Sequence, residues 1–152
     1  ASHDTVGFDF VAQALAAQGY MVIQPQFRGS TGFGSAHYSA GHGEWGKKMQ
    51  DDLSDAVKHF TSKGMVDPKR VCIVGASYGG YAALAGGAFT PDLYKCVVSI
   101  NGIGDLNGML AWDKNQYGNN SEVANYMAMQ FANGKVDNVA DPGSLSSIAY
   151  PH

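Results

Sequence analysis

The sequence has no hydrophobic run near the length of about 20 residues that crosses a membrane as a helix. It also has no cluster of lysine and arginine: 10 basic and 13 acidic residues give a formal net charge of −3. Nucleic-acid-binding proteins usually carry a basic patch, so we expect neither a nucleic acid nor a membrane as a partner. Histidine, aspartate and glutamate show no H-E-x-x-H or comparable spacing, so we expect no metal and no cofactor.

Cysteine is scarce as well, with only Cys72 and Cys96 in 152 residues. The two lie in separate apolar runs and lack the spacing of a zinc site or a redox pair. We therefore expect two buried free thiols, which behave in a core as small hydrophobic side chains. They do not indicate whether the protein works in the cytoplasm or the periplasm.

Glycine, by contrast, is abundant, with 20 residues that fall mostly where apolar segments meet. The chain is 45% hydrophobic and 15% charged, which suits one domain with one core. Short apolar runs predict buried strands, and hydrophobic residues at helical spacing predict helices. The expected strands cover 20–23, 71–74 and 96–100, and the expected helices cover 8–18, 47–63, 81–85 and 121–131. This alternation favours a mainly parallel sheet with flanking helices.

The most informative segment is Gly75-Ala76-Ser77-Tyr78-Gly79, between an expected strand and an expected helix. In that context G-x-S-x-G predicts a nucleophile elbow, a sharp turn whose strained backbone pushes the serine hydroxyl out above the sheet. Side chains at 75 and 79 would collide with the neighbouring strand and helix, so we expect both positions to require glycine. The first N–H groups of the helix point to where an oxyanion would form. A serine that only caps the helix is the structural alternative.

Several motifs, in this order along nearly the whole chain, resemble the prolyl oligopeptidase family of serine peptidases, particularly its acylaminoacyl-peptidase and dipeptidyl-peptidase-like members. They are Gly7-Phe8-Asp9, Gly19-Tyr20, Arg28-Gly29-Ser30-Thr31-Gly32-Phe33-Gly34, Glu44-Trp45-Gly46, Met49-Gln50-Asp51-Asp52, Asp67-Pro68-Lys69-Arg70-Val71 and Gly75-Ala76-Ser77-Tyr78-Gly79-Gly80-Tyr81. The combination is specific, although no single motif is.

The resemblance implies an α/β-hydrolase fold, usually preceded by a β-propeller, and cleavage near peptide ends by a Ser-Asp-His triad. Ser77 matches the nucleophile, and the backbone N–H of Tyr78 matches an oxyanion donor. Arg28, Trp45 and Asp52 match framework positions, which we interpret as structural. The expected partners are thus a peptide substrate, the remainder of the catalytic domain and a propeller.

In the resembled family an HGGP-like segment precedes the part that matches this chain, and the triad aspartate and histidine follow it. We therefore expect residues 1–152 to be the central, nucleophile-elbow part of one α/β-hydrolase catalytic domain, inactive or weakly active when isolated. In the family's sheet the strands matching 20–23 and 71–74 are not neighbours, because the missing segment supplies the strand between them. Unpaired backbone groups on both strands would be costly if buried.

No residue within the chain is a good substitute for the missing base or acid. The histidines are His3, His37, His42, His59 and His152, and none follows a late strand. Asp105 follows the strand expected at 96–100, where some α/β hydrolases place the triad acid, but a turn residue is the simpler interpretation. A serine hydroxyl without a base in reach is a poor nucleophile.

Two further functions share the elbow. A carboxylesterase or lipase would use the same serine on ester substrates. A catalytically silent binding module would keep the α/β-hydrolase fold without a base. Reaction with a fluorophosphonate separates silence from chemistry, and a choice of peptide or ester substrates separates the two enzymes.

Overall fold

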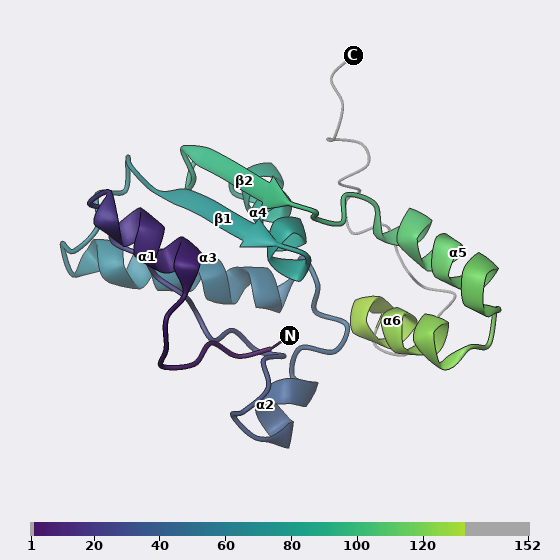
Figure 1. Ribbon diagram of the computed structural model, residues 1–152. Helices are drawn as coiled ribbons and strands as arrows, with labels where there is room; N and C mark the ends of the chain where they lie inside the picture. The colour runs from purple at the N-terminus through teal and green to yellow at the C-terminus, as the bar shows by residue number, and fades with distance from the viewer. Residues whose placement is uncertain (1, 133–152) are drawn as a thin grey trace, which may run out of the picture.

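The computed structural model describes residues 2–132. Its elements follow one another as α1 (Phe10–Ala17), α2 (Ser35–Ser39), α3 (Lys48–Ser62), β1 (Cys72–Ala76), α4 (Tyr78–Phe89), β2 (Cys96–Ile100), α5 (Leu106–Tyr117) and α6 (Glu122–Ala132). In Figure 1 the two strands lie side by side, α3 runs beneath them, and α5 and α6 form a hairpin at one end. The helices expected at 47–63 and 121–131 and the strand expected at 96–100 are confirmed.

The sheet consists of β1 and β2, which pair in parallel as predicted, with Cys72 opposite Cys96 and Ala76 opposite Ile100. The Ser77 N–H continues the ladder by donating to the Ile100 carbonyl oxygen at 3.0 Å. The first residue after β1 is therefore held by the neighbouring strand. The α/β-hydrolase class expected from the sequence agrees with this strand–helix–strand unit.

Small residues bring α4 close to the sheet and to the loop after β2, as the sequence predicts. A Cβ at Gly87 would lie 2.8 Å from Cγ2 of Val97 on β2. Gly80 and Gly102 lie back to back, since a Cβ at Gly80 would lie 2.6 Å from the Gly102 Cα. The start of α4, which carries the Ser77 turn, is thus packed against backbone that leaves no room for side chains.

The core lies between α4, the start of α3 and the α5–α6 hairpin. Its buried members are Trp45, Met49, Tyr81, Ala85, Leu106, Leu110 and Ala128. The sequence did not predict α5, although its end signals are local: Asp105 caps its N-terminus and Gly118, at φ 96°, ends it. Its buried side chains, Leu106, Leu110 and Asp113, lie on one face of the helix, but one of them is charged. The large apolar side chains of Trp112 and Tyr117 are exposed, so hydrophobicity alone does not mark the buried face.

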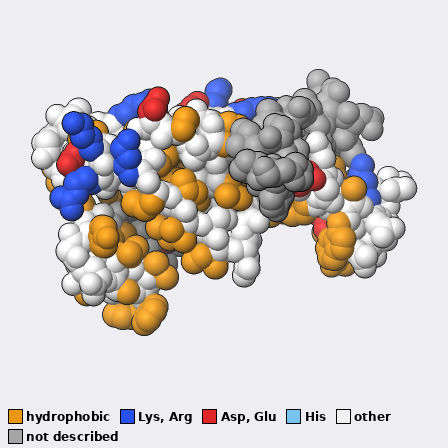
Figure 2. All heavy atoms as spheres, turned by 90° about the horizontal axis from the view of Figure 1, so that it is seen from above, with side chains coloured by type: hydrophobic (Ala, Val, Ile, Leu, Met, Phe, Trp, Pro, Cys, Tyr) orange, Lys and Arg blue, Asp and Glu red, His pale blue; other side chains and the backbone are white. Residues whose placement is uncertain are grey.

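Two predictions about strands are wrong in the described part of the chain. Residues 20–23 form no strand, because a strand needs a ladder partner and these residues pair with neither β1 nor β2. The strands β1 and β2 are also not buried: Val74 is 40% exposed and Val98 43% exposed. Figure 2 shows hydrophobic side chains gathered on the face seen from above, over α1 and the sheet.

The prediction of buried free thiols is wrong as well. Cys72 and Cys96 form a disulfide, and both residues are exposed. They lie far apart in sequence but directly opposite each other in the parallel register, with Cα atoms 4.6 Å apart. That separation lies within the range a disulfide bridges without backbone movement. Pairing of the strands therefore created a bond that the spacing of the cysteines did not indicate.

Between residues 2 and 132, none of the helices combines the length and apolar character that a membrane span requires.

We predict that iodoacetamide adds no mass to the protein unfolded without reductant, because both cysteines are paired. After reduction, two alkyl groups should add to the segment containing Cys72 and Cys96. Peptide mass spectrometry checks both values. Alkylation of both thiols before reduction would show that the strands carry free cysteines.

Candidate active site

The Ser77 turn joins the carboxyl end of β1 to the first residue of α4. Ser77 has φ 55° and ψ −116°, in the half of backbone space that side chains other than glycine rarely occupy. The residue is exposed and its side chain makes no hydrogen bond to the start of α4, so it is not a capping serine. The serine is therefore exposed at the carboxyl end of β1, on a strained turn held by the Ile100 carbonyl.

The two glycines of the motif have different roles. A Cβ at Gly75 would overlap the carbonyl group of Gly79 and lie 2.8 Å from its Cα, so Gly75 makes room for the turn. A Cβ at Gly79 would meet nothing within 4 Å. The prediction that Gly79 is needed to avoid a collision is therefore wrong. The collision would occur at position 75, where a side chain would meet the backbone of Gly79.

The start of α4 supplies N–H groups beside the serine. Within the helix the Tyr81 N–H donates to the Ser77 carbonyl oxygen at 3.1 Å, while the N–H groups of the residues before it lie in the first turn and have no acceptor in the helix. One of these, the backbone N–H of Tyr78, belongs to the residue directly after the serine. Free N–H groups at a helix N-terminus favour negative charge, so this end of α4 can stabilise an oxyanion next to the Ser77 hydroxyl.

The histidines among residues 2–132 have contacts away from Ser77. The ring of His3 hydrogen-bonds to the Thr31 hydroxyl, and that of His37 to the Phe27 carbonyl. His42 packs edge-on against Tyr38, and His59 is exposed beside Phe60. His152 lies outside the described residues.

Asp105 has a local structural role. Its carboxylate accepts a hydrogen bond from the Gly108 N–H at 2.9 Å and caps the N-terminus of α5. A side chain engaged in this way fits the expected local role better than that of a triad acid. Among the described residues, no three His, Cys, Asp or Glu side chains lie together as metal ligands would.

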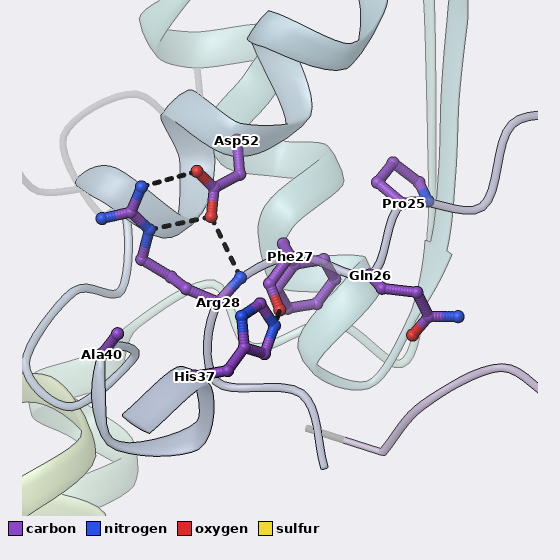
Figure 3. A pocket seen from close by; sticks show the side chains of 7 residues that line it. All are labelled: Pro25, Gln26, Phe27, Arg28, His37, Ala40 and Asp52. Atoms are coloured by element: carbon purple, nitrogen blue, oxygen red, sulfur yellow. Dashed lines mark hydrogen bonds and ion pairs between the residues drawn. The ribbon is translucent and has the colours of Figure 1, made fainter. Parts of the chain in front are cut away.

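Arg28 and Asp52 form a bidentate ion pair beside a cavity of about 400 Å³ (Figure 3). The Arg28 Nε donates to Asp52 Oδ2 at 2.8 Å and Nη2 donates to Oδ1 at 2.7 Å. The Arg28 backbone N–H also donates to Oδ2 at 3.0 Å. The pair joins the loop that begins at residue 28 to α3, which agrees with the structural role expected for both residues.

Burial alone would raise the pKa of Asp52, because it disfavours the charged carboxylate. The hydrogen bonds from the Arg28 side chain and backbone and the guanidinium charge outweigh that effect, so the pKa lies below its ordinary value. The same ion pair raises the pKa of Arg28. Both partners are therefore charged at neutral pH.

Comparison with known proteins decides the family. The sequence profile of the prolyl oligopeptidase family matches residues 6–141. The chain belongs to this family. Within it, the chain is 47% identical over 110 residues to the dipeptidyl aminopeptidase BIII of Pseudoxanthomonas mexicana, a match that covers 72% of this chain and 16% of the relative. It is 45% identical over 105 residues to the dipeptidyl peptidase family member 6 of Caenorhabditis elegans, covering 69% and 14%.

The chain thus spans about one sixth of the length of these prolyl oligopeptidase family relatives. A more distant relative is the acylamino-acid-releasing enzyme 1 of Oryza sativa subsp. japonica, 34% identical over 67 residues, which make up 44% of this chain and 9% of the relative. The family and the α/β-hydrolase class that the motifs indicated are both confirmed.

One group of residues beside the Ser77 turn was not predicted as a unit. The ring of Tyr78 lies 4.6 Å from that of Trp45 and 5.4 Å from that of Phe27, between ring centroids. Tyr81 lies 5.3 Å from Trp45 and completes the aromatic cluster, the name used below for Phe27, Trp45, Tyr78 and Tyr81. Sequence spacing could indicate only the Tyr78–Tyr81 pair, one helical turn apart.

Gly75→Ala should destabilise the protein by about 1–3 kcal/mol or more, because its methyl group would overlap the Gly79 carbonyl. Gly79→Ala is the matched control. It should be neutral or stabilise by up to about 1 kcal/mol, because the new methyl group meets open space and alanine favours a helix. Urea unfolding followed by circular dichroism measures both, and equal losses would contradict the assigned geometry.

Asp52→Asn should cost about 1–3 kcal/mol of unfolding free energy at pH 7, because it removes a charged acceptor of three hydrogen bonds. The folded-state pKa of Asp52 lies below its unfolded value of about 3.9, so the unfolded state binds more protons between the two. The stabilisation is therefore complete above about pH 4 to 5 and is lost as the pH falls through the folded pKa.

Urea unfolding at several pH values tests this dependence. The difference in stability between the wild type and Asp52→Asn should shrink as the solution becomes acidic. A difference that stays constant down to pH 2 to 3 would show that the carboxylate charge is not what stabilises the loop.

Proposed function

We propose that this chain carries the nucleophile of a serine peptidase that hydrolyses peptide bonds near peptide ends, with Ser77 as that nucleophile. The observation that supports this most is the backbone of Ser77, which is strained, exposed and placed between a strand and a helix N-terminus. A protein keeps such strain where the site needs it. The relatives named as dipeptidyl peptidases support peptides as the substrate class.

In the proposed reaction the Ser77 oxygen attacks the carbonyl carbon of the scissile peptide bond. Its proton passes to a histidine base, and the carbonyl oxygen becomes an oxyanion that accepts a hydrogen bond from the Tyr78 N–H. The C–N bond then breaks, the base gives its proton to the leaving amine, and an acyl group remains on Ser77. Water hydrolyses this ester and regenerates the hydroxyl. An oxyanion donor of this kind typically contributes about 2.7–4 kcal/mol to transition-state stabilisation.

We propose that the base and its aspartate partner come from parts of the catalytic domain outside this chain. His3 and His37 hydrogen-bond to Thr31 and Phe27 and not to Ser77. The chain also spans only about one sixth of the length of its relatives. The apolar side chains exposed over β1 and β2, such as Val74 and Val98, would then lie against those parts. A β-propeller before the catalytic domain completes the proposed protein, as the family resemblance implies.

A catalytically silent module is the second candidate, and it applies to the chain in isolation. It is favoured because the described residues bring no histidine hydrogen bond to Ser77. A carboxylesterase or lipase would use the same elbow. No contact among residues 2–132 favours esters, and the names of the relatives favour peptides.

We predict that Ser77→Ala in the full-length protein abolishes covalent labelling by a fluorophosphonate and release of dipeptides from a peptide substrate. The cause is loss of the oxygen that forms the acyl-enzyme. Intact-mass spectrometry detects the label, and liquid chromatography detects the products.

Ser54→Ala is a suitable control, because Ser54 is a buried serine in the middle of α3 and should leave labelling unchanged. A full-length Ser77→Ala protein that still takes up the fluorophosphonate would refute the role of Ser77. Residues 1–152 alone should label far more slowly than the full-length protein, because the base is missing.

A further inference from the structure

The residue whose N–H would serve as oxyanion donor is held by its own side chain. Tyr78 opens α4, and its ring is enclosed by rings from two other segments. Trp45 meets it edge-on, at 4.6 Å and an interplanar angle of 70°, and Phe27 lies at 5.4 Å and 36°. Aromatic pairs at these separations stabilise the packing beyond the effect of the area they bury.

Both neighbours of Tyr78 are themselves anchored. The Phe27 carbonyl is hydrogen-bonded to the His37 ring, and the next residue, Arg28, is bound through its backbone and side chain to Asp52 on α3 (Figure 3). Trp45 is only 8% exposed and precedes Gly46, where a Cβ would lie 2.5 Å from the Tyr81 hydroxyl oxygen. Neither ring can move far without breaking these contacts.

The aromatic cluster adds no charge near the site. Burial raises the pKa of Tyr81 to about 12 and also raises that of Tyr78, so both phenols are neutral at working pH. Their hydroxyl oxygens are buried and have no hydrogen-bond partner among the described residues. The rings therefore act through shape and packing and not through hydrogen bonds of their hydroxyl groups.

We infer that Trp45 and Phe27 are positioning residues that hold Tyr78 so that its backbone N–H points at the oxyanion formed on Ser77. The inference rests on the proposed function. The side chain and the N–H of Tyr78 share one Cα, so a backbone shift that carries the ring into a gap also tilts the peptide unit between Ser77 and Tyr78. Because oxyanion stabilisation depends on donor direction, a small tilt lowers the rate without changing how the substrate binds.

The test compares Trp45→Leu with Tyr94→Leu in the full-length protein. Both substitutions remove a buried aromatic ring that packs around α4, since Trp45 is 8% and Tyr94 7% exposed. Tyr94 lies beside Gly86, far along α4 from the elbow, where a Cβ on Gly86 would be 2.9 Å from its ring. The two variants should therefore lose comparable stability but differ in catalysis.

We expect Trp45→Leu to lower kcat about 10- to 100-fold and to leave KM within about twofold of wild type. The loss in kcat should be smaller than that caused by removing an oxyanion donor outright. The inhibition constant of a peptide aldehyde, whose adduct carries the same oxyanion, should rise by the same factor. Trp45→Phe should restore most of kcat, and Tyr94→Leu should leave kcat within about threefold of wild type. Each variant is measured well below its own melting temperature.

Equal kcat for Trp45→Leu and Tyr94→Leu, or a loss that falls on KM alone, would overturn the inference while leaving Ser77 as the nucleophile. A Ser77→Ala protein that remains active would instead overturn the proposed function. If Trp45→Leu does not fold, Phe27→Leu against Tyr94→Leu makes the same comparison, because Phe27 contacts Tyr78 from the other segment.

Discussion

The structure depends on the fit of Gly75 beneath the carbonyl of Gly79. Without a side chain at 75, the chain can leave β1, turn at Ser77 and enter α4 within a single residue. The hydrogen bond from the Ser77 N–H to Ile100 on β2 holds that turn against the neighbouring strand. The positive φ of Ser77 is maintained by backbone contacts on both sides, so the strained turn does not depend on a hydrogen bond of the serine hydroxyl.

The remaining elements support the start of α4. Gly80 and Gly102 allow the helix to touch the loop after β2, and Gln50 on α3 donates to the Ala82 carbonyl at 3.0 Å from the other side. The aromatic cluster packs the side chain of Tyr78 into the core. Asp52 and Arg28 link this cluster to α3 through Phe27. A residue at the edge of the sheet is thus connected to the interior through rigid backbone and large rings.

Local signals predicted the elements near the elbow well. A run of β-branched residues, a glycine-flanked serine and a small-residue helix are all defined within about 20 residues, and the structure has each of them. Two errors came from assuming neighbours that the described chain does not provide: residues 20–23 form no ladder, and β1 and β2 stay partly exposed. The helix α5 was missed although Asp105 and Gly118 carry its end signals, because its buried face includes a charged residue, Asp113, while apolar Trp112 is exposed.

The sequence by itself determined the family, the parallel strand–turn–helix unit and Ser77 as the candidate residue, because these depend on short-range patterns and on motif order. The tertiary structure alone decided which contacts join distant segments. It placed Cys72 opposite Cys96, assigned the spatial constraint to Gly75 and not to Gly79, and brought Phe27 and Trp45 to the ring of Tyr78. Such contacts depend on strand register and helix packing, which no spacing within a single segment specifies.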